Sequence, residues 1–176
     1  MRRMFCVCLL VLGLMLSSSI VIAGDFYVIP VKGQYTSWGK KIPGATRFKL
    51  VLDAAALDRE TGLVWDNSPD TTQRDWFKAC AHCYQRQVGG RKGWRLPTIE
   101  ELASLVDTSV SGAPTLPTDH PFTNVQSGLY WSSTTIAGST SLAWTVYFSN
   151  GDVYATDKST DYYVWCVRGG YGHDAY

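Results

Sequence analysis

The chain has 176 residues, a formal net charge of +1 and an aromatic content of 13%. A charge this close to zero argues against non-specific nucleic-acid binding, which needs a positive surface that releases counterions from phosphates. The length suits one domain and is sufficient to bury a substantial core.

The first 23 residues have the three parts of an export signal. Arg2 and Arg3 supply positive charge, the run from Phe5 to Leu16 is apolar, and small residues end at Ala23. The apolar run is shorter than the ~20 residues that span a bilayer. We therefore expect residues 1–23 to be a cleaved signal peptide. The mature protein would be exported, periplasmic or extracellular, without stable membrane insertion.

The rest of the chain divides into three parts. Residues 24–46 contain one short apolar run that Pro30 breaks, so we expect an N-terminal arm or linker there. One domain is predicted over residues 47–170, and residues 171–176 form a tail.

The domain opens with extended segments. Residues 47–52 and 54–57 have the pattern of strands, and the polar turn that ends at Gly62 precedes Leu63-Val64-Trp65. These signals indicate a hairpin closing around Gly62.

A first helix is predicted from about Gln73 to Gln87. Thr71 or Thr72 can cap its start, and Gly89-Gly90 ends it. Apolar residues recur at three- and four-residue steps, which places on one buried face Trp76, Phe77, Cys80, Cys83 and Tyr84.

A second helix follows Pro97. Thr98 and Glu101 have the spacing of a capping box, in which each side chain satisfies a backbone donor of the first turn. The adjacent Glu100 and Glu101 diverge by about 100° around the helix and cannot form an acid/base pair by themselves. The buried stripe of this helix is expected to comprise Ile99, Leu102, Ala103 and Val106.

A loop rich in Pro, Ser and Thr is expected at residues 108–127, and four strands follow it. They are predicted at residues 129–133, 143–148, 153–156 and 162–168. Asn150-Gly151 is a strong hairpin signal between the second and third, because both residues tolerate positive φ. Two helices with strands on either side indicate an α+β fold.

Three cysteines remain after signal removal, which in an exported chain implies one disulfide and one leftover thiol. The favoured bridge joins Cys83 to Cys166 and closes a loop of about 80 residues. Cys80, one helical turn earlier, is the alternative partner. A redox or metal role for Cys80-Ala-His-Cys83 would need a helix-start position or a second ligand pair. We expect no metal and no cofactor.

Five motifs resemble those of a known family, in the same order. They are RFKLVLDAAALDRETGLVWDN, CYQRQVGGRKGWRLPTIEELASLVD, LYWSSTT, AWTVYFSNGDVY and YYVWCVRGG. The chain from Phe48 to Gly170 is similar to the Lcl C-terminal domain family. That family resembles the C-type-lectin-like fold. The resemblance implies two helices packed on small antiparallel sheets, adjacent N- and C-terminal strands, and ligands on a loop-rich face.

The resemblance also implies scaffold roles. We expect Trp94 to fill the core between sheet and helix. Arg95 should hold loop carbonyls or a carboxylate, with a direct ligand contact as the alternative. Trp165 departs from the family pattern, which usually has Arg there. The positions carried over as scaffold are Trp65, Cys83, Trp94, Arg95, Leu96, Pro97, Trp131, Trp144 and Cys166.

A ligand surface is predicted on the last strands. If Trp144, Val146 and Phe148 face the core, alternation turns the intervening side chains outward. Outward aromatic and hydroxyl side chains suit a low-entropy contact surface, whereas ordinary cross-strand packing is the alternative interpretation. The predicted patch comprises Thr145, Tyr147, Tyr154, Thr156, Lys158 and Tyr162.

These observations favour an exported, non-catalytic binding or adhesion module that recognises a protein or a surface polysaccharide. Related collagen-like proteins use this family's domain in adhesion, and oligomer formation is left open. The alternative is an enzyme of the formylglycine-generating type. Such an enzyme requires paired cysteines late in the chain, where only Cys166 lies.

Overall fold

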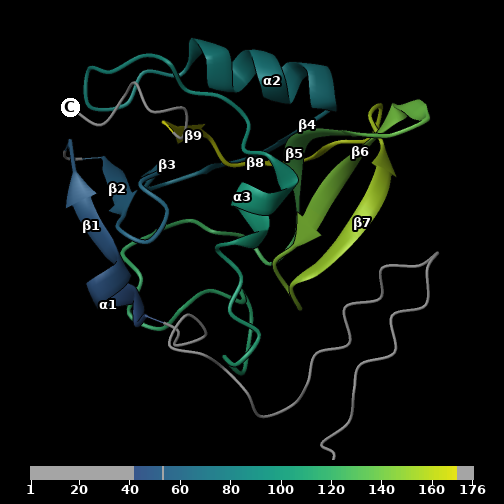
Figure 1. The fold of residues 1–176 in the computed structure, drawn as a ribbon. Helices are drawn as coiled ribbons and strands as arrows, with labels where there is room; N and C mark the ends of the chain where they lie inside the picture. The colour runs from purple at the N-terminus through teal and green to yellow at the C-terminus, as the bar shows by residue number, and fades with distance from the viewer. Residues whose placement is uncertain (1–41, 53, 170–176) are drawn as a thin grey trace, which may run out of the picture. The chain divides into compact units, whose positions relative to one another are not determined.

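The computed structural model describes residues 42–52 and 54–169. The predicted signal peptide, most of the predicted arm and the tail lie outside these residues. The described residues form two β-sheets and short α-helices, so the predicted α+β class is confirmed (Figure 1). Helix α1 (Gly44–Arg47) forms a single turn where the arm was expected to end.

The first sheet unites the N-terminal hairpin with the last strand. Its order is β1-β2-β3-β9, with antiparallel neighbours throughout. The predicted hairpin at Gly62 is confirmed, and this glycine has a φ of +75°, which it adopts without steric cost. The strands are β1 (Phe48–Val51), β2 (Ala55–Asp58), β3 (Val64–Asp66) and β9 (Val167–Arg168).

The expected adjacency of the first and last strands is wrong. Strand β9 pairs with β3, and β1 occupies the opposite edge of the sheet (Figure 1). The backbone of Arg95 holds β9 from its other side, because its N–H and C=O both bond to Val167 at 2.9 Å. The C-terminal strand therefore lies between β3 and the Arg95 segment.

The second sheet has the order β4-β8-β5-β6-β7. It is mixed rather than antiparallel, because β8 runs parallel to β5. The predicted hairpin at Asn150-Gly151 is confirmed between β6 and β7. The strands are β4 (Asp70–Arg74), β5 (Leu129–Ile136), β6 (Ser139–Tyr147), β7 (Asp152–Asp157) and β8 (Tyr162–Val164).

Helix α2 (Trp76–Gln85) is shorter than predicted, and neither Thr71 nor Thr72 caps it. Both threonines lie in β4, whose pairing with β8 overrides the local helix signal. Asp75 is the N-cap, since its carboxylate accepts the backbone N–H of Lys78. Gly89-Gly90 lies beyond the helix, in a turn that Val88 and Arg91 close.

The predicted buried face of α2 is wrong at two positions. Phe77 is 68% exposed and Tyr84 is 83% exposed. The helix instead buries Ala79 and Cys83, four residues apart, against β4, β5 and β8. Phe77 and Tyr84 lie seven residues apart, so they project from the same, outer side of α2.

Helix α3 (Ile99–Ala103) begins with the predicted capping box, which is confirmed. Thr98 Oγ1 accepts the N–H of Glu101, and Glu101 Oε2 accepts the N–H of Thr98 at 2.8 Å. Arg95 donates to both oxygens of the Glu101 carboxylate, from Nη1 and Nη2, each at 2.7 Å. Its Nη2 also donates to the Gly169 carbonyl. Arg95 thereby joins the start of α3 to the end of the domain.

Replacing Thr98 by Ala is expected to lower the free energy of unfolding by about 1 kcal/mol, because the N–H of Glu101 loses its acceptor. Urea denaturation of the variant measures this loss. Glu100→Gln is the matched control, since Glu100 is exposed and lies in the same turn outside the capping box. Equal losses in both variants would contradict the capping role.

Two cores hold the domain together. The first core packs Trp165 edge-to-face against Trp65 and Phe122, with ring centroids 5.7 and 4.9 Å apart. The second core surrounds the Cys83–Cys166 disulfide and contains Trp94 and Trp131. The favoured cysteine pairing is therefore the one observed.

Other predicted scaffold residues divide between buried and partly buried positions. Leu96 and Pro97 are buried, and the Pro97 carbonyl accepts the N–H of Ser133 at 2.7 Å. Trp144 belongs to neither core and is only partly buried, contrary to expectation. Its partner across the β6–β7 ladder, Ala155, is exposed, so that face of the hairpin lacks a packed layer there.

Candidate functional site

The predicted patch on the last strands is not one continuous surface. Thr145 is fully buried, and its hydroxyl donates to the Tyr154 carbonyl on β7 at 3.1 Å. The outward orientation expected for Thr145 is therefore wrong. Thr156 is partly buried and its hydroxyl approaches the Ala143 carbonyl at 3.5 Å. Both threonines engage the backbone of the β6–β7 ladder.

Lys158 and Tyr162 stabilise the packing of α2 on the second sheet. Lys158 is buried and not part of an outward surface: Nζ lies 4.0 Å from the centroid of the Trp76 ring and donates to Thr135 Oγ1 at 2.9 Å. Tyr162 packs against Trp131 at 5.1 Å between ring centroids. These two residues therefore lie apart from the tyrosines near the β6–β7 turn.

Tyr147 and Tyr154 remain as a surface pair near the Asn150-Gly151 turn. Their ring centroids lie 6.3 Å apart, and Tyr154 is 42% exposed. The hydroxyl of Tyr154 donates to Asp152 Oδ2 at 3.2 Å. This pair is what remains of the predicted patch, and two rings make a small contact area.

A groove at the opposite end of the β6–β7 hairpin brings together residues from three elements. It has a volume of about 610 Å³. The start of α2, the start of β6 and the turn after β7 form its walls. Its lining residues, which define the α2 groove, are Asp75, Phe77, Lys78, Thr140, Ser141, Asp157, Lys158 and Ser159.

The aromatic wall of the α2 groove, Phe77, is held in place by Trp76. Phe77 packs edge-to-face on Trp76, with centroids 5.2 Å apart and planes at 87°. Trp76 is itself anchored, because its Nε1 donates to the Ser132 carbonyl at 2.8 Å and Lys158 lies over its ring. The exposed Phe77 ring therefore rests on a fixed layer.

The polar wall of the α2 groove carries hydroxyls and one exposed carboxylate. Asp157 Oδ1 accepts both the N–H and the hydroxyl of Ser159, at 2.9 and 2.7 Å. These bonds lower the pKa of Asp157, so its carboxylate is ionised at neutral pH. Its second oxygen accepts no hydrogen bond from any residue in the described ranges.

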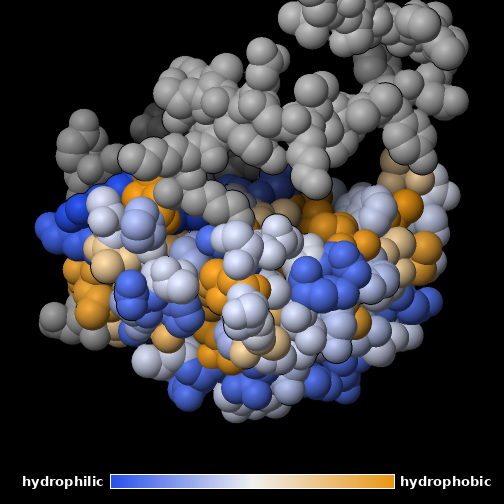
Figure 2. All heavy atoms as spheres, turned by 90° about the horizontal axis from the view of Figure 1, so that it is seen from below, coloured by the Kyte–Doolittle hydropathy of each residue, from blue (hydrophilic) through white to orange (hydrophobic). Residues whose placement is uncertain are grey.

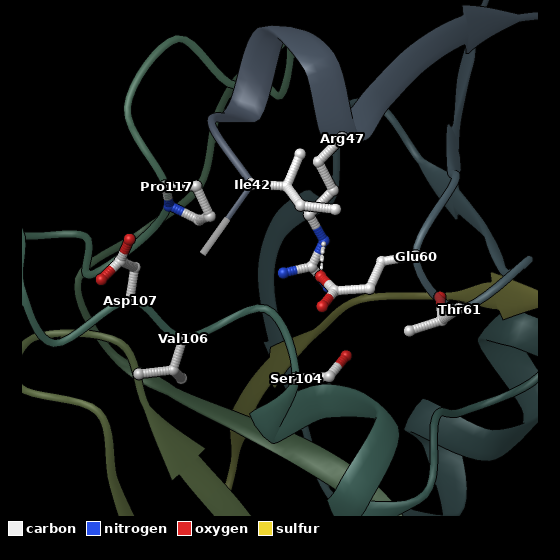
Figure 3. A pocket seen from close by; sticks show the side chains of 8 residues that line it. All are labelled: Ile42, Arg47, Glu60, Thr61, Ser104, Val106, Asp107 and Pro117. Atoms are coloured by element: carbon white, nitrogen blue, oxygen red, sulfur yellow. Dashed lines mark ion pairs between the residues drawn. The ribbon is translucent and has the colours of Figure 1, made fainter. Parts of the chain in front are cut away.

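A smaller pocket of about 320 Å³ lies beside the buried Arg47 (Figure 3). The Arg47 guanidinium donates to both carboxylate oxygens of Asp58, at 2.9 and 2.7 Å, and lies 3.2 Å from Glu60 Oε2. Two carboxylates neutralise its charge. The pocket therefore offers no net positive charge to an anion, and we interpret the cluster as structural.

Another pocket of about 320 Å³ lies between β3 and the segment after α2. Asp66 and Arg86 pair across it at 2.6 Å. Burial raises the pKa of Asp66 by more than Arg86 lowers it. The Arg86 guanidinium also ties the end of α2 to the first sheet, so this pair has a clear structural role.

Two observations concern possible metal ligands and the thiol of Cys80. Within residues 42–52 and 54–169, no three His, Cys, Asp or Glu side chains are grouped so as to hold a metal ion. Cys80 is half-buried, and burial raises the pKa of its thiol, which makes it less nucleophilic at neutral pH.

Within residues 42–52 and 54–169, no helix has the length and apolar character needed to cross a membrane.

The face of the domain away from α2 has no large hydrophobic area in the part that Figure 2 shows. In Figure 2, its hydrophobic areas are small and interleaved with hydrophilic ones wherever the surface is not covered by grey atoms.

Phe77 was wrongly predicted to be buried, because the three- and four-residue spacing of apolar residues does not by itself say which side of the helix faces the core. The small residues Ala79 and Cys83 could have indicated the buried side of α2, since close packing of a helix on a sheet favours small side chains.

Comparison with known proteins identifies one family. The model of the Lcl C-terminal domain matches residues 54–168. A search of curated proteins finds no match. The matched segment contains both sheets from β2 onward, the disulfide and every residue that lines the α2 groove.

Proposed function

Because the chain belongs to the Lcl C-terminal domain family, we propose that it is an exported, non-catalytic binding module of the adhesion type. Its ligand is a protein or a surface polysaccharide, and the domain is C-type-lectin-like. The arrangement of the N-terminal hairpin and the C-terminal strand in one sheet is consistent with that fold. Function in the periplasm or outside the cell follows from the predicted signal peptide.

The α2 groove replaces the strand patch as the proposed binding surface. The observation that carries this proposal is the 68% exposed ring of Phe77, which lies beside hydroxyl and charged groups in a groove of about 610 Å³. An exposed aromatic ring on a rigid support gives contact area at a low entropic cost. The volume lies in the range of small-ligand sites.

The formylglycine-generating alternative is disfavoured by a specific bond. Such chemistry needs free cysteine thiols late in the chain, and Cys166 is bonded to Cys83. Cys80, the cysteine outside a disulfide among the described residues, lies on α2 beside the second core.

Capture experiments with bacterial envelope material test the proposed surface. The mature protein is immobilised, and envelope fractions are applied after protease treatment, after periodate oxidation of sugars, or untreated. We expect Phe77→Ala to reduce capture of untreated material about tenfold, because the ring supplies the main apolar contact. Loss of capture after one of the two treatments identifies the ligand as protein or polysaccharide.

The double variant Tyr147→Ala/Tyr154→Ala is the control for these measurements. It removes two partly exposed rings from the far end of the same hairpin and leaves the α2 groove intact. Retained capture is expected. If the double variant loses capture and Phe77→Ala does not, the binding surface lies at the tyrosine pair and the α2 groove is wrong.

A further inference from the structure

We propose that the open edge of strand β7 binds an extended, basic segment of a partner protein, which adds a strand to the second sheet. The observation that carries this inference is the juxtaposition of unpaired backbone groups in the middle of β7 with a carboxylate at each of its ends, Asp152 and Asp157. The inference goes beyond the proposed function, since it adds a second site that recognises its ligand mainly through the backbone.

The backbone of β7 directs alternate residues toward β6 and away from the sheet. The ladder of β6 and β7 is antiparallel, and just beyond its end the N–H of Lys158 bonds to the Ser141 carbonyl at 2.9 Å. Hydrogen-bonded pairs recur at every second residue of such a ladder, so the even-numbered residues of β7 bond to β6 as Lys158 does. The N–H and C=O groups of Val153 and Ala155 therefore point outward. They bond to no residue in the described ranges beyond the sheet.

The other three sheet edges within residues 42–52 and 54–169 are short, interrupted or already covered. Strand β1 has four residues and carries Lys49, a charged side chain of the kind that protects edges. Strand β9 has two residues, and the backbone of Arg95 bonds to its other side. The ladder of β4 has a register shift. Strand β7 lies at the outer edge of its sheet (Figure 1), pairs over all six residues without a shift and contains neither Pro nor Lys.

The side chains of β7 suit contact with a further strand. Val153 and Tyr154 are each 42% exposed, and Ala155 is exposed as well. β-branched and aromatic side chains stabilise cross-strand pairs. A strand added at this edge would therefore gain side-chain contacts in addition to its backbone hydrogen bonds.

The charges at the two ends of β7 select a basic partner. Asp152 and Asp157 are exposed, and within the described residues their carboxylates accept hydrogen bonds from neutral groups alone. The two residues are five positions apart, so their side chains point to opposite faces of the sheet. A partner strand with Lys or Arg at two positions five apart places one cation beside each carboxylate.

The same charges argue against a second copy of β7 as the occupant. An antiparallel pair of β7 strands that aligns all six residues places Asp152 of each copy opposite Asp157 of the other. A parallel pair would align each aspartate with its own counterpart. Like charges directly opposite each other are destabilising in both arrangements.

Titration with a matched set of peptides tests this inference. The mature protein, labelled with ¹⁵N, is titrated with end-blocked Lys-Val-Thr-Val-Thr-Lys and followed by NMR. We expect a dissociation constant of about 0.1–1 mM, because a short peptide buries few side chains. The largest shifts are expected at the amide groups of Val153 and Ala155. Binding should weaken at least about threefold between roughly 50 and 500 mM salt.

Three altered peptides separate backbone pairing from charge. N-methylation of both valines blocks one edge of the peptide, and N-methylation of both threonines blocks the other. One of these two forms is expected to bind at least about tenfold more weakly than the other, since only one edge can face β7. Val-Lys-Thr-Lys-Val-Thr has the same composition with a different spacing of lysines, and it is expected to bind more weakly than the first peptide.

Variants of the protein assign the binding to β7. Ala155→Pro removes an outward N–H that the ladder with β6 does not use, and it is expected to abolish binding. Asp152→Asn combined with Asp157→Asn keeps the shape of both side chains and is expected to weaken binding about tenfold, with a smaller salt dependence. Asp161→Asn is the matched control, because Asp161 is exposed and lies outside β7.

The outcomes separate this inference from the proposed function. Asp157 also lines the α2 groove, so Phe77→Ala is titrated with the same peptide and is expected to bind it as the wild type does. Loss of binding in Phe77→Ala but not in Ala155→Pro would place the peptide in the α2 groove and overturn the inference. No binding by the wild type, or equal binding of the two N-methylated forms, overturns it as well. Capture of envelope material through Phe77 is a separate measurement that none of these results decides.

Discussion

Replacing Cys83 and Cys166 together by Ala is expected to lower the free energy of unfolding by about 4.5 kcal/mol. The bridge spans 83 positions of sequence and joins α2 to the residue before β9. Its loss restores conformational freedom to most of the unfolded domain. Urea denaturation of the mature protein, followed by tryptophan fluorescence, measures the change.

Two comparisons make this expectation specific to the bridge. Cys80→Ala removes a half-buried thiol from the same helix and leaves the disulfide intact, so we expect a loss of about 1 kcal/mol at most. A reducing agent should destabilise the wild type as much as the double substitution does, and should not affect the double variant. A reduced wild type that is as stable as the oxidised protein would contradict the prediction.

The disulfide also bears on the proposed binding surface. Cys83 lies on the buried side of α2, whereas Phe77 projects from its outer side. The second core and the bridge hold the helix against the sheet, and this support keeps the Phe77 ring in position over the groove. We therefore expect that a reduced protein which remains folded binds its ligand more weakly, although no ligand contact is removed.

Local signals in the sequence correctly predicted one capping box and two hairpins. The capping box of Thr98 and Glu101 needs four consecutive residues, and the two hairpins use Gly62 and Gly151, which both adopt a positive φ. In each case the atoms that stabilise the feature lie within a few positions of one another. No knowledge of distant packing was needed.

The prediction for Thr145 failed because both faces of strand β6 are packed. Alternation assigns one face to the core and one to solvent only when a single face is covered. In β6, Ala143 belongs to the second core and Val146 to the first, so both faces are packed. Thr145 lies between them and satisfies its hydroxyl on β7.

Long-range pairing explains the error at the start of α2. Polar residues in the segment 70–74 were expected to begin a helix, yet they form β4 against β8, which lies far along the chain. Asp70 supports the strand locally, because its carboxylate accepts the N–H of Thr72 and pairs with Arg74. Only the fold brings β8 to this position, so the sequence alone favoured the wrong element.

The second large effect is expected at the buried pair of Arg47 and Asp58. Asp58→Ala should lower the free energy of unfolding by about 3–5 kcal/mol, because it leaves the Arg47 guanidinium buried without its main partner. The Glu60 N–H and the Thr61 hydroxyl lose the same carboxylate as acceptor. Glu60→Gln is the matched control. Glu60 is 45% exposed, so its ion pair with Arg47 contributes under about 1 kcal/mol.

The pair also predicts how stability depends on pH. Burial alone raises the pKa of Asp58, but hydrogen bonds and charge from Arg47, with help from Glu60 and Thr61, lower it below its ordinary value. A lowered folded-state pKa stabilises the fold above the unfolded-state pKa of about 4. This contribution is lost as the pH falls through the folded-state pKa.

Urea denaturation of the wild type and of Asp58→Asn at about pH 7, 5, 4 and 3 tests this dependence. The wild type is expected to lose stability below about pH 4 more steeply than the variant, since the substituted amide cannot be protonated in this range. The difference between the two proteins should be largest near neutral pH and should shrink at the acidic end of the series. Parallel curves would mean that Asp58 is not held as a carboxylate by Arg47, and the two residues would then not form an ion pair in solution.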